Sequence, residues 1–230
     1  MHQLSERHIF QRFDGELSHL HDLVLEMGGI VHQQLKDALE AFKTQNLAMA
    51  QQVMSRDTQV DSLEVQADAA IINVIARHSP LGSDLRTVIT VSKSVSDLEK
   101  IGDEAARIAH LQTQISREDH GTLTRVLVAE IDRIGEMELS NYLSAVELFE
   151  AWDETKALRV IEGHRQMDGE FQSELQRLMS SIKANTIDIG LAVSLALVAK
   201  ALERITHHAQ NLAEYAMFER EGVDLRLNQH

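Results

Sequence analysis

The chain has 230 residues with a single proline, no cysteine and a formal net charge of −14. The lack of cysteine excludes disulfides and thiolate metal ligands, and the acidic balance disfavours nucleic acid and anionic lipid as partners. The N-terminus is too polar for a signal peptide, and no apolar run approaches the roughly 20 residues of a membrane span. We therefore expect a cytoplasmic protein with no membrane insertion.

Helix-favouring residues fill long segments of the chain, with apolar residues every three or four positions. Turn-forming residues interrupt this pattern at five places, which are residues 44–46, 77–84, 116–122, 150–154 and 183–190. The sequence therefore predicts an all-α fold of six helices, each about 25 to 38 residues long.

Helices of this length joined by short loops pack as antiparallel bundles. In the third predicted helix the apolar stripe advances by about 3.5 residues, the spacing of a bundle seam. We expect this seam to consist of Leu85, Val88, Ser92, Val95, Leu98, Gly102, Ala105 and Ala109.

The sequence also repeats itself. At an offset of 104 residues the third helix aligns with the sixth, so that Glu99 falls on Glu203. At an offset of 107 the first two helices align with the fourth and fifth, so that Gly28 falls on Gly135. We therefore expect two tandem three-helix bundles, which are residues 1–117 and 118–230. Each should carry its own version of any site.

Acidic residues line one face of the second predicted helix, where Asp57, Asp61, Glu64 and Asp68 follow a helical spacing. Each pair of like charges at this spacing destabilises an exposed helix by about 0.2 to 0.5 kcal/mol unless something cancels the repulsion. The third helix adds a second acidic pair, and carboxylates that face each other from two helices suit hard cations. We therefore predict a metal site that consists of Asp57, Asp61, Glu99 and Asp103.

The second unit carries the matched set His164, Asp168, Glu203 and His207. Imidazole replaces a carboxylate at one position on each helix, and both groups bind metals. We predict a second metal site here, in which imidazole favours Zn²⁺, Ni²⁺ or Fe²⁺ over Mg²⁺ or Ca²⁺. Its affinity should fall below about pH 6.5 as histidine is protonated. Two further histidines, His110 and His208, are expected on the surface and outside the site.

Three segments of the sequence carry a resemblance to a known family. They are "MGGIVHQQLKDAL" at 27–39, "SDLRTVITVSKSVSDLEKIGDEAARIA" at 83–109 and "ALERITHHAQNLAEY" at 201–215. These segments closely resemble the PhoU family of bacterial phosphate-signalling regulators, and the "LEKIGD" block matches the repeated E/D-x-x-x-D signature of that family. The resemblance covers essentially the whole chain.

The resemblance implies two three-helix bundles whose acidic motifs hold multinuclear clusters of divalent or trivalent metal ions, among Fe, Zn, Mn, Mg and Ni. It implies a cytoplasmic, homodimeric negative regulator of the phosphate regulon that restrains phosphate uptake. Two partners are implied, the ATPase subunit of the high-affinity phosphate transporter and the phosphate-sensing histidine kinase. The family usually has an acid at the positions of His164 and His207, so the second site departs from the pattern.

Two other classes of protein remain open. A di-metal enzyme of the ferritin-like kind would use Glu-x-x-His pointing inward, whereas the spacing here is Glu203-x-x-x-His207. A metal-free scaffold would dock its acidic faces directly on basic partner surfaces. The sequence holds neither a G-x-S-x-G nucleophile elbow nor a G-x-x-x-x-G-K-[ST] nucleotide loop, and no Gly-rich loop or Arg cluster that would capture free phosphate. We therefore expect a protein that is not an enzyme.

Overall fold

The computed structural model describes residues 2–115 and 122–222 of the chain, with side chains described for 12–115 and 125–222. Six helices make up this part of the chain, and it contains no strand. They are α1 (His2–Thr44), α2 (Leu47–His78), α3 (Gly82–Gln114), α4 (Thr122–Glu150), α5 (Glu154–Lys183) and α6 (Ile189–Glu221). The predicted all-α fold of six helices is confirmed.

The helices begin and end at residues with the expected turn chemistry. Asn46 caps α2 by accepting a hydrogen bond from the backbone N–H of Met49 at 3.1 Å. Asp153 and Asp188 cap α5 and α6 in the same way, each at 3.0 Å. Ser79, with a φ of 46°, terminates α2 immediately before Pro80. The predicted break at 116–122 and the boundary between 117 and 118 lie largely outside the described residues.

The first helix differs from the prediction, because α1 has 43 residues. It begins at His2 and continues through the polar N-terminal stretch. No proline interrupts that stretch, and the lone glycine within it, Gly15, costs a helix only about 1 kcal/mol. The polar composition that argued against a signal peptide is therefore compatible with a helix.

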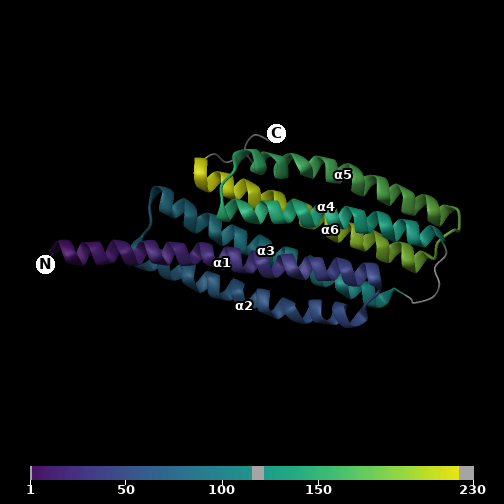
Figure 1. Cartoon of the computed structure of the whole chain (residues 1–230), viewed down its shortest axis with the longest axis horizontal. Helices are drawn as coiled ribbons and strands as arrows, with labels where there is room; N and C mark the ends of the chain where they lie inside the picture. Colours follow the sequence, from purple (N-terminus) through teal and green to yellow (C-terminus); the bar gives the residue numbers. More distant parts are fainter. Residues whose placement is uncertain (1, 116–121, 223–230) are drawn as a thin grey trace.

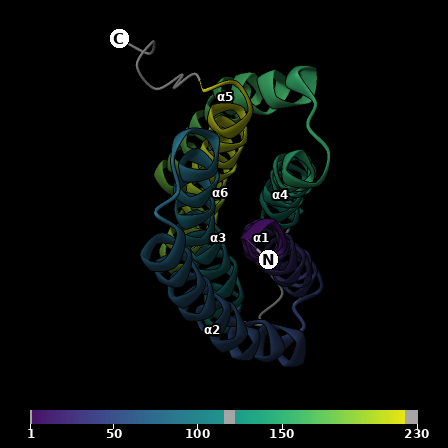
Figure 2. The same ribbon diagram turned by 90° about the vertical axis from the view of Figure 1, so that its left-hand side faces the viewer.

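The two three-helix units pack against each other along two pairs of antiparallel helices, α1 with α4 and α3 with α6 (Figure 1). Seen along the long axis, α2, α3, α6 and α5 form a curved layer, and α1 and α4 lie on its inner side (Figure 2). One cluster of buried apolar residues extends through both units. No helix in the described part of the chain is both long and apolar enough to cross a membrane.

A reciprocal contact between α1 and α4 shows the repeat directly. A Cβ on Gly28 would lie 2.7 Å from Cγ1 of Val146, and a Cβ on Gly135 would lie 2.5 Å from Cδ2 of Leu39. Gly28 aligns with Gly135 at the offset of 107, and Leu39 aligns with Val146 at the same offset. The same close approach of a glycine to an aliphatic side chain therefore occurs twice, as an approximate two-fold relation between the units requires.

The buried face of α3 differs in part from the predicted seam. Val88, Val95, Leu98, Gly102, Ala105 and Ala109 are buried as expected. Leu85 is 39% exposed, however, and Ser92 is only half-buried. A straight helix turns every 3.6 residues, so a stripe read at 3.5 drifts away from the core along its length. In addition, α3 contacts α1, α2 and α6, and its buried face is wider than a single seam.

Candidate metal centres

The middle of α2 and α3 carries five carboxylates, which we call the carboxylate cluster: Asp57, Asp61, Glu64, Glu99 and Asp103. The two helices pack side by side, so helical spacing brings one row of acids against the other. Asp61 and Asp103 are exposed, and the other three are half-buried. The facing arrangement predicted from the sequence is therefore present, and it includes Glu64 as a fifth member.

Partial burial and mutual repulsion raise the pKa values of carboxylates in this cluster. The pKa of Glu99 is raised to about 7, first by partial burial and then by the charges of Asp103, Glu64 and Asp61. Partial burial also raises the pKa of Asp103, and the charges of Asp57 and Asp61 add to the effect. The nearby Lys100 offsets only part of the repulsion at Glu99. The cluster therefore has an excess of negative charge that a bound cation would relieve.

A buried amide from a third helix holds one of these carboxylates in place. The side-chain amide of Gln34 on α1 donates hydrogen bonds to Oδ1 of Asp57 at 2.9 Å and to the carbonyl of Gly102 at 3.3 Å. A Cβ on Gly102 would lie 3.3 Å from Cγ1 of Val60 and 3.5 Å from Oδ1 of Asp57. Glycine at this position therefore leaves room for Gln34 to reach Asp57.

The donor set of the cluster fits hard metal ions, because it supplies only oxygen ligands and carries unbalanced negative charge. In the described part of the chain, however, no three histidine or acidic side chains converge closely enough to hold a metal ion. An ion would therefore bind here only if side chains rotated toward it.

The second predicted set lines a pocket of about 270 Å³ between α5 and α6. We call it the histidine cluster: His164, Asp168, Glu203, His207 and His208. Nε2 of His164 lies 3.5 Å from Oδ2 of Asp168, and the rings of His164 and His207 are 5.9 Å apart. Glu203 is held by Lys200 at 2.6 Å. The four predicted residues are therefore brought together, but a lysine already neutralises one of the carboxylates.

The chemistry of the histidine cluster differs from that of the carboxylate cluster. Partial burial lowers the pKa of His207, and the neighbouring His208 and His164 lower it further. A neutral imidazole keeps a lone pair that can bind a metal ion. Nδ1 of His164 is buried without a hydrogen-bond partner. This cluster therefore offers nitrogen ligands with little excess negative charge.

The histidine cluster reaches the first unit across the contact between α3 and α6. Nδ1 of His208 lies 3.1 Å from Oδ1 of Asp97, and the ring of His208 is 5.8 Å from that of His207. Asp97 also accepts a hydrogen bond from Lys100 at 3.3 Å. His208, expected on the surface and outside the site, is in fact half-buried and paired with a carboxylate of the other unit. His110 is exposed, as expected.

Three residues of this region were not predicted as part of the sites, namely Gln34, Glu64 and His208. Glu64 had a signal, because it belongs to the acidic face of α2. Gln34 had none, because it reaches Asp57 from α1, a helix that sequence spacing does not relate to the site. His208 follows His207 on α6, but its partner Asp97 lies on α3 of the other unit, and sequence spacing does not indicate that contact.

An all-helical chain built from two copies of a three-helix unit, each with a polar cluster between its last two helices, defines a class of repeated bundle proteins. Comparison with protein families gives two matches to the family described as PhoU domain, at residues 24–111 and 131–216. The chain belongs to the PhoU family.

Individual relatives support this assignment. The chain is 35% identical over 219 residues to the phosphate-specific transport system accessory protein PhoU homolog of Pseudomonas putida, which covers 95% of this chain and 84% of that protein. The PhoU protein of Escherichia coli (strain K12) is 29% identical, with coverage of 96% and 90%. The crystal structure of PhoU from Pseudomonas aeruginosa superposes with a TM-score of 0.86 at 32% identity, covering 92% of this chain and all of that one.

Proposed function

We propose that this protein is a cytoplasmic regulatory adaptor of phosphate transport, and that its carboxylate cluster binds divalent or trivalent metal ions. Its relatives bear the name of phosphate-specific transport system accessory proteins, which supports the transport role. The observation that carries the metal proposal is the row of carboxylates that α2 and α3 bring together. Partial burial and the charges of these neighbours raise the pKa of Glu99 to about 7, which is consistent with an insufficient counter-charge. The role we propose is regulatory rather than catalytic.

The residues that would hold the metal are Asp57, Asp61, Glu99 and Asp103, with Glu64 beside them. Bound cations would neutralise the surplus negative charge of the carboxylates. They would also supply open coordination positions on an exposed face of the protein. Gln34 would orient Asp57 through its hydrogen bond, as outer-shell amides do at metal sites. A partner that carries carboxylate or phosphate groups could then reach the protein through the metal.

The histidine cluster would be the second metal site, formed by His164, Asp168, Glu203 and His207. We propose that it prefers Zn²⁺, Ni²⁺ or Fe²⁺, because two of its four donors are imidazoles. Metal binding there must displace Lys200 from Glu203, so this site should be the weaker of the two.

Two partners follow from the resemblance to the PhoU family: the ATPase subunit of the phosphate transporter and the phosphate-sensing histidine kinase. We propose that the protein, as a homodimer, couples them and restrains phosphate uptake when phosphate is plentiful. A metal-free docking mode remains the second candidate, since the same acidic face would attract a basic partner surface directly.

The deciding experiment is elemental analysis of untagged protein, followed by calorimetric titration of the metal-free protein with Mn²⁺, Fe²⁺ and Zn²⁺. We expect binding to the wild type and its loss from the carboxylate cluster in the double variant Glu99→Gln, Asp103→Asn. The matched control removes two exposed carboxylates elsewhere, Glu40→Gln and Glu162→Gln, and should bind as the wild type does.

Partner binding is tested on the same variants with the purified transporter ATPase subunit. Metal-dependent docking predicts that a chelator and the double variant each abolish capture of the ATPase subunit. Capture that survives the chelator but fails in the double variant would favour the metal-free mode. Equal metal binding by the double variant and the control would reject the proposed site.

A further inference from the structure

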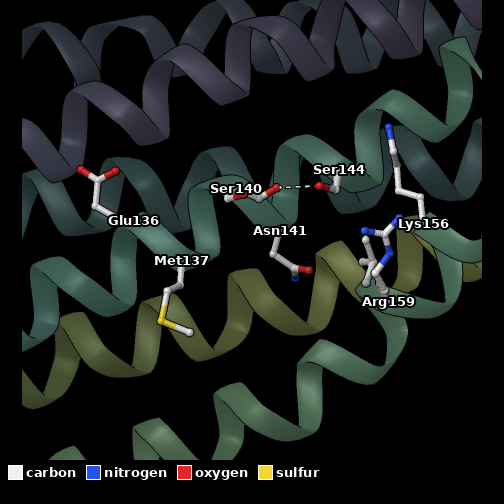
Figure 3. A pocket seen from close by; sticks show the side chains of 8 residues that line it. Glu136, Met137, Ser140, Asn141, Ser144, Lys156 and Arg159 are labelled. Carbon is white, nitrogen blue, oxygen red and sulfur yellow. Dashed lines mark hydrogen bonds between the residues drawn. The ribbon is translucent and has the colours of Figure 1, made fainter.

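A separate pocket of about 580 Å³ lies between α4 and α5 (Figure 3). One face of α4 provides Glu136, Met137, Ser140, Asn141 and Ser144, and the first two turns of α5 provide Lys156, Arg159 and Val160. Glu136 lies at one end of the pocket, and Lys156 and Arg159 lie at the other (Figure 3). The volume is within the range of sites for small organic ligands, about 300 to 1,000 Å³.

The first unit shows why the second has room for this pocket. At the equivalent place between α1 and α2, Gln33 donates a hydrogen bond to Asp37 at 2.7 Å, and Asp37 accepts another from Arg56 at 2.7 Å. At the offset of 107, these three long side chains align with Ser140, Ser144 and Gly163. The second unit thus lacks this hydrogen-bonded network of three side chains and has a lined pocket beside α5 instead.

The cationic end of the pocket suits an anion. Nε of Arg159 donates to the carbonyl of Thr155 at 3.3 Å, and no described acidic side chain forms an ion pair with its guanidinium. Lys156 lies beside it and shares its charge with Glu147 at 2.7 Å. The positive end of the α5 dipole adds to this field. The guanidinium of Arg159 forms no ion pair with a described acid and lies next to an ammonium group, and such a pair of cations suits a phosphoryl group.

The rest of the pocket suits the organic part of a ligand. Ser140, Ser144 and Asn141 offer hydrogen-bonding groups along its middle, and Met137 and Val160 offer apolar contact. Residues 136 to 144 span eight positions of a helix, which is about 12 Å. A molecule of mononucleotide length therefore fits between the cationic end and Glu136.

We propose that this pocket binds a phosphate monoester of about mononucleotide size, with the phosphoryl group at Arg159 and Lys156. The sequence contains no phosphate-binding loop, and this pocket is assembled instead from side chains on two helices. The pocket shares no residue with the carboxylate cluster or the histidine cluster. The proposal is therefore independent of metal binding.

The experiment is titration of the metal-free protein with AMP, monitored by calorimetry and by ligand-observed NMR. We expect AMP to bind, inorganic phosphate to compete with it, and Arg159→Gln to weaken AMP binding at least tenfold. The triple variant Ser140→Gln, Ser144→Asp, Gly163→Arg restores the side chains of the first unit without changing the net charge. It should refill the pocket and abolish binding while Arg159 stays in place.

The controls address charge and folding. Lys183→Gln removes one exposed positive charge far along α5 and should bind AMP as the wild type does. Added bulk at residue 163 is compatible with the fold, because a Cβ there would meet only Oδ1 of Asn141, at 3.6 Å. Unchanged melting by circular dichroism confirms that the variants fold.

Three results would overturn the proposal. One is the absence of AMP binding at millimolar concentration. Another is binding of citrate but not of AMP, which would make the pocket a carboxylate site. The third is AMP binding that survives both Arg159→Gln and the triple variant.

Discussion

Glu138 is the most deeply buried acid of the described chain. It lies on α4 with no exposed surface and accepts a hydrogen bond from the hydroxyl of Thr206 at 2.6 Å. Burial raises its pKa to about 8, although Thr206 and Asn141 act in the opposite direction. The aligned positions in the first unit are Val31 and Gly102, so the second unit has gained a buried polar pair. Glu138 is therefore largely protonated at neutral pH.

This burial predicts a specific pH dependence of stability. The unfolded chain releases the proton of Glu138 near pH 4.5, whereas the folded protein keeps it until about pH 8. The free energy of unfolding should therefore decrease as the pH rises through this window, by on the order of 5 kcal/mol. Glu138→Gln should remove this contribution, so that its melting temperature exceeds that of the wild type increasingly from pH 5 to 8. Thermal melts at several pH values test this.

The control for Glu138 is Glu136→Gln, an exposed carboxylate on the same helix. It should melt in parallel with the wild type at every pH. If the curves of Glu138→Gln and the wild type were also parallel, Glu138 would not carry the proton.

At Glu99 the free energy of unfolding should also decrease as the pH rises, because repulsion between acids adds to the effect of burial. Its pKa of about 7 reflects partial burial and repulsion by neighbouring acids. Without metal, Glu99→Gln should therefore stabilise the protein at pH 8 by about 1 kcal/mol, after allowance for solvent screening, and have no effect at pH 4. Thermal melts in chelator measure the gain. Destabilisation at pH 8 would show that the carboxylate is held by a favourable contact instead.

Spacing along single helices located four residues of each cluster. The i, i+4 pairs Asp57–Asp61 and Glu99–Asp103 can be read from the sequence, and helix packing places them face to face. Gln34 and Glu138 could not be found in this way. Their roles depend on how α1 and α4 are rotated against the other helices, and one sequence does not contain that information.

At the scale of helices, glycine determines how closely α1 and α4 approach. Gly28 and Gly29 are neighbours on α1 with opposite surroundings. A Cβ on Gly28 would lie 2.7 Å from Val146, whereas a Cβ on Gly29 would meet nothing within 4 Å. The two positions therefore form a matched pair for testing the contact.

We predict opposite effects for the two alanine variants. Gly28→Ala should destabilise the protein by about 1 to 3 kcal/mol, because it overpacks the contact with α4. Gly29→Ala should stabilise it by roughly 0.5 to 1 kcal/mol, because alanine favours a helix over glycine. Urea denaturation gives both values. Val146→Ala should rescue Gly28→Ala, and a failure of rescue would place the strain elsewhere.

Element boundaries were predictable wherever a capping or turn residue begins or ends a helix, as at Asn46, Pro80, Asp153 and Asp188. The start of α1 was not, since a polar stretch without breakers is compatible with both loop and helix. The prediction that Leu85 and Ser92 belong to the buried seam of α3 was also wrong, because both are partly exposed. A stripe shows which face is apolar, but not which of its residues a neighbouring helix covers.

For the whole molecule, the question is whether two repeats mean two independently stable units. The repeat was visible in the sequence, but the extent of contact between its copies was not. In the structure α1 packs on α4 and α3 on α6, and ion pairs join the units, including Arg204–Glu104 at 2.8 Å. The buried apolar cluster includes residues from both units. Neither unit has a core that is closed on its own.

A shared core predicts that the chain unfolds in one transition. Leu63 on α2 is 6% exposed, and within the described part of the chain α2 contacts only α1 and α3. Leu63→Ala should cost about 2 to 5 kcal/mol within the first unit. The only tryptophan, Trp152, packs against the core between α4 and α5 and so reports on the second unit. Its fluorescence midpoint in a thermal melt should fall together with the circular dichroism midpoint.

The mirror variant, Leu178→Ala on α5, should lower both midpoints as well. If Leu63→Ala left the Trp152 transition in place while part of the helical signal melted early, the repeats would be separate folding units, and the contacts between α3 and α6 would not couple them.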